Sequence, residues 1–152
     1  IQTIASTGLR VSEIKFVTFE AIKRRQAIIN CKGKIRQVFL PEKLCIILQK
    51  YASKQGIKSG SLFVTRTGTP LDRSNIWRML KELCESAGVS KEKVFPHNFR
   101  HLFARTYYSL QKDIVRLADI LGHSNINTTR IYTAESGTEH MKQLQKLGFL
   151  RC

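Results

Sequence analysis

The residues with the clearest chemical potential are a histidine and a tyrosine toward the end of the sequence. His123 precedes Tyr132 by nine residues in the segment LGHSNINTTRIYT. A tyrosine phenol can attack phosphorus when cations neutralise the phosphate and a base lies nearby. Small and polar residues between apolar ones are also typical of the turn and second helix of a DNA-binding helix-turn-helix. The segment alone therefore leaves two hypotheses, cutting DNA and recognising it.

A second group of polar residues lies in the stretch HNFRH. His97 and Arg100 are three residues apart and share a helical face, where a guanidinium can bind two phosphate oxygens and an imidazole can move a proton. A basic surface helix would show the same pattern. The spacing of His97 and His101 is that of a zinc-binding HExxH helix, but Asn98 stands where the general base is needed and Arg100 is cationic. We expect no metal here.

Two further motifs carry cations. In TGLRVSEI, Arg10 is either a surface residue paired with Glu13 at helical spacing or an anion ligand held in place by that carboxylate. In CKGKIR, Lys32, Lys34 and Arg36 form either a solvated turn or a finger placed in a DNA groove. A lysine delivers a proton readily when neighbouring cations lower its pKa.

The overall charge favours a polyanionic partner. The 152 residues include 26 Lys and Arg against 11 Asp and Glu, which gives a net charge of +15. Such an excess is typical of nucleic-acid binding, with a solubilising surface as the alternative. No basic amphipathic helix with an aromatic apolar face is apparent, which disfavours a membrane surface.

The composition is that of one globular domain in a reducing compartment. Hydrophobic residues make up 42% of the chain, and no apolar run approaches the ~20 residues of a membrane span. No signal peptide is visible. The four cysteines form no CxxC pair, so neither a zinc site nor a disulfide framework is indicated. The abrupt apolar start at Ile1 suggests that an N-terminal part lies outside the sequence.

The sequence pattern predicts an α+β chain that is mainly α-helical, with a small antiparallel β-sheet. Two strands at 27–30 and 35–40 flank the turn CKGK. Pro41 ends the second strand, and Asp72 or Ser74 caps a later helix. Helices are expected over 3–19 (broken near residues 7 and 8, with Ser12 as the second cap), 42–55, 72–87, 96–111, 114–121, 127–132 and 138–147, and a short strand over 61–65.

Taken together and in this order, the motifs resemble the catalytic domain of the tyrosine recombinase (phage integrase) family. The strings TGLRVSE, HNFRHLFA and LGHSNINTTRIYT carry the likeness, which covers residues 7–132. Arg100 and His123 are 23 residues apart, and the nine residues to Tyr132 are also family-like. The resemblance implies the DNA breaking-rejoining enzyme fold over residues 1–152, without its first helix or strand and without an N-terminal DNA-binding domain.

The resemblance also implies a role for each matching residue. The phosphate clamp would be Arg10, Arg100 and His123, the general acid Lys32, the proton-handling residue His97, the support for the first arginine Glu13, and the nucleophile Tyr132. The family's turn reads glycine-lysine-glycine-x-lysine, whereas here Cys31 replaces the first glycine and one residue is missing. Lys34 therefore stays an alternative to Lys32, and Lys34 and Arg36 are expected to contact DNA.

The implied function is a site-specific DNA recombinase or integrase that cleaves and rejoins strands through a 3′-phosphotyrosine, without metal, ATP or another cofactor. A helix-turn-helix regulator and a type IB topoisomerase-like enzyme are the alternatives. The expected partners are double-stranded DNA and, on DNA, three further copies joined through the amphipathic tail 138–150. The oligomeric state of the free protein stays open, with a monomer as one possibility. A prokaryotic cytoplasmic location at the nucleoid follows, while a mobile-element integrase and a chromosome-dimer resolvase both stay open.

Overall fold

The computed structural model describes residues 1–31 and 33–132, with only the backbone of Lys93. Lys32, the predicted tail at 138–150 and Cys152 lie outside the described residues. The elements are α1 (Gln2–Thr7), η1 (Val11–Phe16), α2 (Phe19–Arg24), β1 (Gln26–Cys31), β2 (Lys34–Phe39), α3 (Glu42–Gln55), α4 (Arg73–Ser86), η2 (Lys91–Lys93), α5 (Pro96–Gln111), α6 (Ile114–Leu121) and α7 (Asn127–Arg130), where η marks a 3₁₀ helix. The predicted architecture, mainly helical with one small antiparallel sheet, is confirmed.

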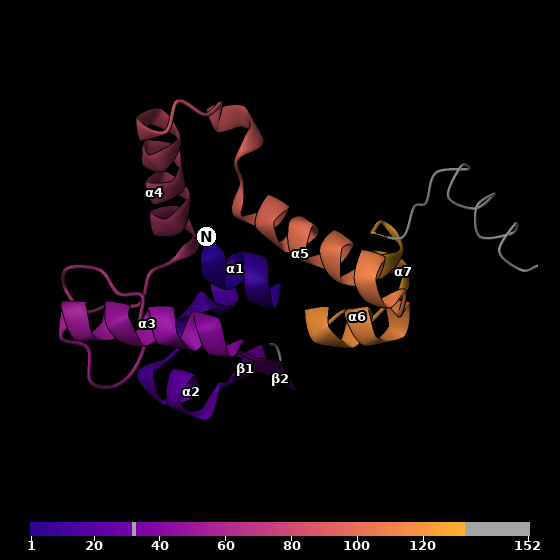
Figure 1. The fold of residues 1–152 in the computed structure, drawn as a ribbon, viewed down its shortest axis with the longest axis horizontal. Coiled ribbons are helices and arrows are strands. Elements are labelled where there is room, and N and C mark those ends of the chain that lie inside the picture. Colours follow the sequence, from indigo (N-terminus) through magenta and orange to yellow (C-terminus); the bar gives the residue numbers. More distant parts are fainter. Residues whose placement is uncertain (32, 133–152) are drawn as a thin grey trace, which may run out of the picture.

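The short helix α1 connects the two sides of the molecule. It contacts α3 on one side and α5 on the other, and α6 packs against both α5 and α7. Figure 1 shows α2, α3 and the hairpin on one side of α1, with α5, α6 and α7 on the other; α4, drawn above α3, contacts η1 and α5. The N-terminal and C-terminal motifs can therefore meet only where these two sides face each other.

The hairpin forms as predicted, with the first strand one residue longer at each end and the second shifted by one residue. β1 and β2 pair antiparallel from Gln26 opposite Phe39 to Cys31 opposite Lys34. Alternate side chains along β1 are buried, so one face of the hairpin packs on the core and the other faces solvent. Gly33 and Lys34, the described residues at the hairpin turn, are exposed.

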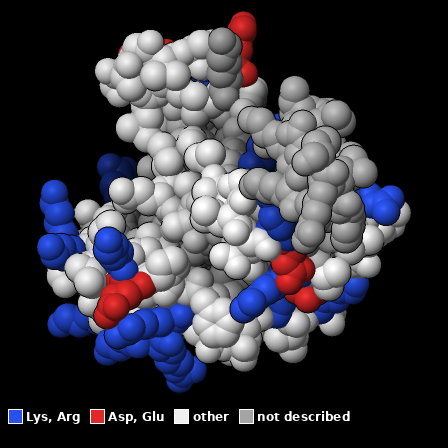
Figure 2. All heavy atoms as spheres, turned by 45° about the vertical axis from the view of Figure 1, so that its right-hand side comes forward, with Lys and Arg blue, Asp and Glu red and all other residues white. Residues whose placement is uncertain are grey.

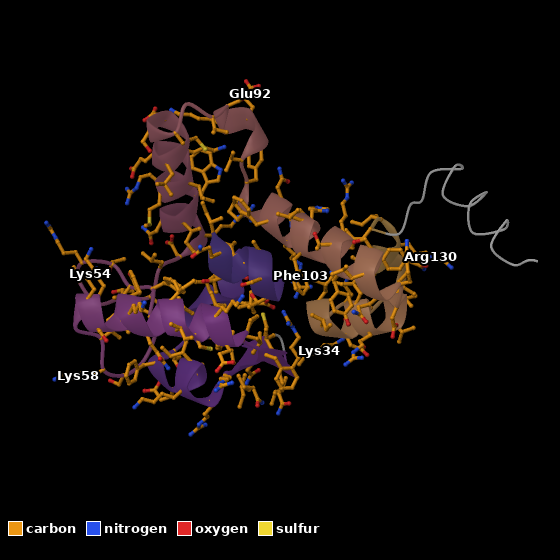
Figure 3. All side chains as sticks on the ribbon, viewed as in Figure 1. Lys34, Lys54, Lys58, Glu92, Phe103 and Arg130 are labelled. Carbon is orange, nitrogen blue, oxygen red and sulfur yellow. The ribbon has the colours of Figure 1, made fainter. Side chains whose placement is uncertain are left out.

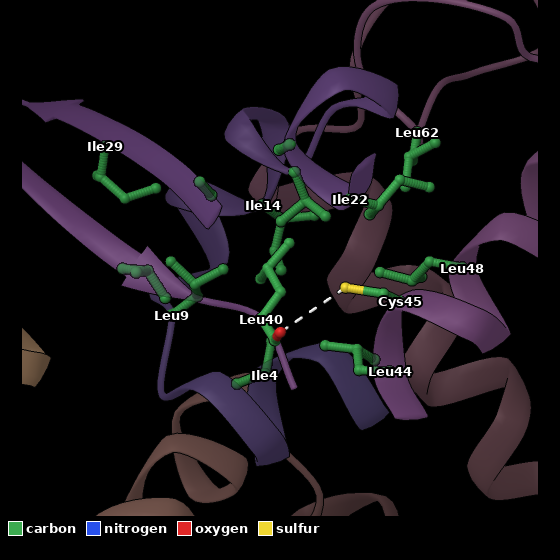
Figure 4. Close-up of a cluster of buried hydrophobic side chains, with 14 of the residues drawn as sticks. Ile4, Leu9, Ile14, Ile22, Ile29, Leu40, Leu44, Cys45, Leu48 and Leu62 are labelled. Atoms are coloured by element: carbon green, nitrogen blue, oxygen red, sulfur yellow. Dashed lines mark hydrogen bonds between the residues drawn. The ribbon is translucent and has the colours of Figure 1, made fainter. Parts of the chain in front are cut away.

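Two apolar clusters of different size hold the fold together. The larger gathers aliphatic side chains from α1, η1, α2, the hairpin and α3 (Figure 4), and the Cys45 thiol donates to the Leu40 carbonyl at 3.7 Å within it. The smaller lies among α5, α6 and the α7 turn and consists of Ala104, Leu117, Leu121 and Tyr132. The predicted nucleophile is thus part of a core.

The predictions for residues 3–19 and 61–65 were wrong in detail. The first segment is not two α-helices: α1 ends at Gly8, whose φ is +66°, and a 3₁₀ helix follows with Arg10, not Ser12, at its N-cap. Residues 61–65 form only isolated bridges, from Ser61 to Thr18 and from Val64 to Pro70.

Candidate active site

The C-terminal end of α6 is the structural centre of the site. A helix leaves its last carbonyls without intrahelical partners, and these carry partial negative charge. Here three consecutive carbonyls accept hydrogen bonds from three arginines that are far apart in the sequence. They are Ile120 from Arg36 Nη1 at 2.9 Å, Leu121 from Arg100 Nη2 at 2.7 Å, and Gly122 from Arg10 Nη2 at 3.3 Å.

A glycine turn places the histidine just beyond this helix end. Gly122 has φ +66°, a conformation that glycine adopts without strain. Its N–H donates to the Asp119 carbonyl at 3.0 Å, and the next N–H, of His123, donates to the Ala118 carbonyl at 2.9 Å. A Cβ atom at Gly122 would collide with the Arg36 side chain. The position of His123 is therefore determined by the turn and by the arginine beside it.

A buried carboxylate joins two of the three arginines. Glu13 is only 1% exposed. Its Oε2 accepts from the Arg10 backbone N–H at 2.7 Å and from Arg36 Nη2 at 2.6 Å, while its Oε1 accepts from Arg10 Nη1 at 3.1 Å. The predicted support of Arg10 by Glu13 fits this geometry, but the second partner, Arg36, was not anticipated.

Arg100 lies behind the others and contacts the histidine directly. Its side chain is buried, Nη1 donates to the Gly8 carbonyl, and Nη2 lies 3.0 Å from His123 Nε2. Burial, and then the charge of Arg10, lower the pKa of Arg100 to about 10. The guanidinium stays cationic at neutral pH, and three of its five donors are accounted for by these contacts.

The hydrogen-bond partners of His123 indicate a neutral imidazole. Arginine can only donate, so Nε2 accepts from Arg100, and the ring proton on Nδ1 donates to Thr129 Oγ1 at 2.8 Å. Burial, and then the charges of Arg100 and Arg10, lower the pKa of His123 to about 4. Thr129 is fully buried in α7 and fixes the ring orientation.

Tyr132 is brought close to His123 but is shielded from solvent. Its side chain is 6% exposed. Its ring lies nearly parallel to that of His123, with 6.5 Å between centroids, and meets the ring of His101 edge-on at 4.9 Å. The tyrosine and the histidine, which follow α7 and α6 respectively, therefore lie next to each other.

The two histidines of α5 differ in exposure. His97 is exposed and His101 is half-buried, with 4.2 Å between their ring centroids. Partial burial, and then the neighbouring charge of Arg100, lower the pKa of His97, and burial together with His97 lowers the pKa of His101. The sequence pattern marks His101 only by the spacing of a zinc ligand and does not indicate its contact with Tyr132. Within the described ranges, no group of three or more His, Cys, Asp or Glu side chains is arranged to hold a metal ion.

A groove of about 750 Å³ opens between the hairpin and the α6 end. Arg10, Lys34, Arg36 and His123 line it, and Lys34 Nζ donates to Ser124 Oγ at 2.6 Å across its mouth. Figure 3 shows Lys34 reaching from the hairpin toward α6. The Arg10 side chain is 41% exposed, so its guanidinium is accessible to an anion entering from solvent.

The structure thus assembles most of the predicted residues around one place, although with different exposures. Those brought together are Arg10, Glu13, Lys34, Arg36, Arg100, His123 and Tyr132, with His97 at the edge and Lys32 outside the described residues. Several cations surround a single carboxylate, which is the arrangement expected for a phosphate site. No helix in the described part of the chain is long and apolar enough to cross a membrane.

Comparison with known proteins agrees with this geometry. Tyrosine recombinase XerH of Campylobacter jejuni is 39% identical over 139 residues, which cover 88% of this chain and 39% of that protein. Tyrosine recombinase XerA of Pyrococcus furiosus is 33% identical over 144 residues, covering 90% and 49% of the two chains. This chain spans about half the length, or less, of these curated relatives.

Solved structures show the same fold. The crystal structure of XerA recombinase superposes with a TM-score of 0.76 at 28% identity, covering 99% of this chain and 57% of that one. XerH site-specific recombinase bound to its difH substrate gives a TM-score of 0.72 at 25% identity, covering 91% and 42%. The fold is therefore that of tyrosine recombinase catalytic domains.

The family follows from the sequence match. The profile described as phage integrase family matches residues 1–139, which is most of the chain. The chain belongs to the phage integrase family, and the resemblance noted from its motifs is confirmed.

Proposed function

We propose that this chain is the catalytic part of a site-specific DNA recombinase that forms a covalent 3′-phosphotyrosine. The observation that carries the proposal is the convergence of Arg10, Arg100 and His123 on one helix end, with Tyr132 beside them. Two relatives more than 30% identical bear the name tyrosine recombinase. Figure 2 shows Lys and Arg side chains exceeding Asp and Glu on the face it presents, which fits a DNA partner.

The electrostatics suit phosphoryl transfer without a metal ion. Negative charge grows on the nonbridging oxygens of the phosphate in the transition state. Arg10 and Arg100 are held by backbone carbonyls before any substrate arrives, so little reorganisation is needed when that charge appears. His123 would add a third polar contact if its ring proton moved from Nδ1 to Nε2, since only a protonated Nε2 can donate to a phosphate oxygen.

The reaction proposed for Tyr132 balances without a cofactor. The phenol gives its proton to a base, the role we propose for His97, and its oxygen bonds to phosphorus, while the bond from phosphorus to the 5′-oxygen breaks. The departing 5′-oxygen takes up a proton from a general acid, for which Lys32 and Lys34 are the candidates and His97 a further proton carrier. Attack by a 5′-hydroxyl reverses these steps and reseals the strand, so bond energy is conserved.

The remaining expectations extend this proposal. Residues 1–152 would correspond to the catalytic domain, since the relatives are about twice as long. Assembly into a tetramer on DNA through residues 138–150, and work at the nucleoid of a prokaryotic cytoplasm, are proposed on the family resemblance.

A nicked or suicide DNA duplex tests the function directly. We expect wild-type protein, at low ionic strength, to form an adduct that survives denaturation and is linked through the DNA 3′-end. Peptide mapping should place the DNA on Tyr132. DNA binding with no adduct, or an adduct on another residue, would overturn the proposal. Exchange between two sites, against relaxation of supercoils alone, separates recombinase from topoisomerase.

A further inference from the structure

We propose that Arg36 is a positioning residue that aligns Arg10 and His123, and that it does not contact DNA. The sequence placed Arg36 among the DNA-binding residues of the hairpin. In the structure its guanidinium faces inward, with the side chain only 16% exposed. The proposal rests on the function proposed above, because alignment matters only if the site performs the reaction.

The contacts of Arg36 connect three separate segments. From β2, Nη2 donates to Glu13 Oε2 at 2.6 Å in η1, and Nη1 donates to the Ile120 carbonyl at 2.9 Å at the end of α6. Glu13 in turn holds both the backbone and the side chain of Arg10. One side chain therefore ties the hairpin to the element that presents Arg10 and to the helix that presents His123.

The Arg36 side chain also packs closely against the backbone of Gly122, which couples its position to the turn before His123. The Arg36 side chain lies where a Cβ atom of residue 122 would be, so only glycine leaves room for it. His123 follows immediately in the chain. Movement of Arg36 would therefore be felt at the turn that sets the histidine, as well as at Glu13.

The charge of Arg36 is partly compensated by Glu13. Its partner Glu13 is buried and shares its carboxylate between two arginines, whereas Arg10 has a 41% exposed side chain facing the groove. A guanidinium engaged in this way adds little to counterion release on DNA binding. A lysine at position 36 would keep the charge but could not form the same two-armed contact, since it lacks the planar fork.

Hydrogen exchange of the free protein tests the alignment without DNA. We expect Arg36→Lys and Arg36→Gln to accelerate exchange of the Gly122 and His123 amides at least 10-fold, because these amides close the α6 turn. Core amides such as that of Leu48 should keep their protection, which shows that the variants fold. Arg25→Gln, which breaks the exposed Arg25–Glu42 pair, is the matched control and should leave the turn unchanged.

Kinetics on DNA provide the second measurement. In single-turnover adduct formation we expect Arg36→Lys to be about 10-fold slower than wild type and Arg36→Gln about 100-fold slower. Displacing a catalytic side chain by about 1 Å can produce an effect of this size. The slope of log affinity against log salt should stay at the wild-type value in Arg36→Gln. Loss of a phosphate contact would instead reduce the magnitude of that slope by about 0.9.

Each outcome decides the proposal. Amide exchange at Gly122 and His123 that is unchanged in the Arg36 variants would overturn the proposal. A smaller slope of log affinity against log salt, together with a normal rate of adduct formation at saturating DNA, would also overturn it and would favour a DNA contact of Arg36. If wild-type protein forms no adduct, the proposed function fails, and faster exchange in both variants would still establish Arg36 as the residue that orders the turn.

Discussion

The larger apolar cluster and the smaller one serve different purposes in this molecule. The larger joins α1, η1, α2, the hairpin and α3 through aliphatic side chains such as Leu9, Ile22 and Leu62, all almost completely buried. The smaller contains Tyr132 among its few buried members and is bordered by Arg100 and His123. Apolar packing holds the first region, while hydrogen bonds from charged groups join the second to it.

This difference means that the larger cluster mainly determines the stability of the fold, whereas the hydrogen bonds at the α6 end mainly determine the alignment of the site residues. An aliphatic cluster tolerates small shifts, because burial free energy has no direction. The contacts at the α6 end are directional, and removing the donor leaves a carbonyl without its partner, buried at Leu121 and partly buried at Ile120 and Gly122. Substitutions in the larger cluster should therefore change mainly the free energy of unfolding, and substitutions at the α6 end mainly the rate.

The largest effect is expected at the nucleophile. Tyr132→Phe should abolish adduct formation, because no oxygen is left to attack, while the free energy of unfolding changes by only about 1 kcal/mol. Denaturing gels with the nicked substrate measure the first quantity and urea titration the second. Tyr51→Phe, on α3, is the matched control and should retain wild-type activity; adduct in Tyr132→Phe would rule out the assigned nucleophile.

The next largest effect is expected at the buried arginine. Arg100→Lys should slow adduct formation about 100-fold to 1000-fold. It should also destabilise the fold by about 1–3 kcal/mol, since the Gly8 and Leu121 carbonyls cannot both keep a donor. Arg105→Lys, exposed on the same helix, serves as control. A rate loss below about threefold in Arg100→Lys would contradict a direct role on the phosphate.

A pair of leucines compares the two clusters directly. Leu62→Ala and Leu117→Ala each remove a fully buried side chain and should each destabilise by about 2–5 kcal/mol. Only Leu117→Ala should also slow adduct formation, by about 10-fold, when rates are corrected for the folded fraction measured by circular dichroism. Equal rates in the two variants would remove the distinction between the clusters.

Two glycines in the same backbone conformation, one at the end of α3 and one at the end of α6, allow a second comparison of stability with alignment. Gly56 and Gly122 both have positive φ, +68° and +66°, but only Gly122 has a side chain pressed against it. Gly56→Ala should therefore cost about 1 kcal/mol, and Gly122→Ala distinctly more, with slower adduct formation. Thermal melts and single-turnover assays compare them, and identical destabilisation would show that Arg36 moves away freely.

The smallest effect is expected in the pH dependence of the folding stability. Histidine in the unfolded chain has a pKa of 6.5, and that of folded His123 is about 4, so the unfolded state takes up a proton first as the pH falls. The contribution to stability is complete above pH 6.5 and is lost progressively toward pH 4. Between pH 6.5 and pH 4, the melting temperature of His123→Gln should fall by a few degrees less than that of the wild-type protein. Curves of melting temperature against pH that run parallel for the two proteins would contradict this prediction.

The sequence was sufficient to predict the order of most helices and both strands, and to select most of the residues that the structure brings together at the α6 end. Strong local signals, such as the Asp72 and Asp113 caps and the hairpin turn, predicted α4, α6 and both strands. The shift to a 3₁₀ helix after Gly8 was not predictable from periodicity, because it depends on Glu13 turning back to the Arg10 backbone.

The inward direction of Arg36 was also beyond the sequence. Its position on a basic hairpin is compatible with a solvated or a DNA-facing side chain, and only the nearby α6 carbonyls and buried Glu13 decide between them. The same holds for Thr129 and His101, whose roles depend on which ring each one meets in space. Contacts between distant segments carry no local pattern.

The three arginines at the end of α6 determine which residues must be exchanged together when the site is moved between homologues. Residues 114–132 hold both His123 and Tyr132 and resemble a self-sufficient cassette. Their placement nevertheless depends on donors contributed by positions 10, 36 and 100. A chimera that exchanges only this cassette between distant homologues would keep the helices and lose the geometry, so functional swaps must move all three arginines along with it.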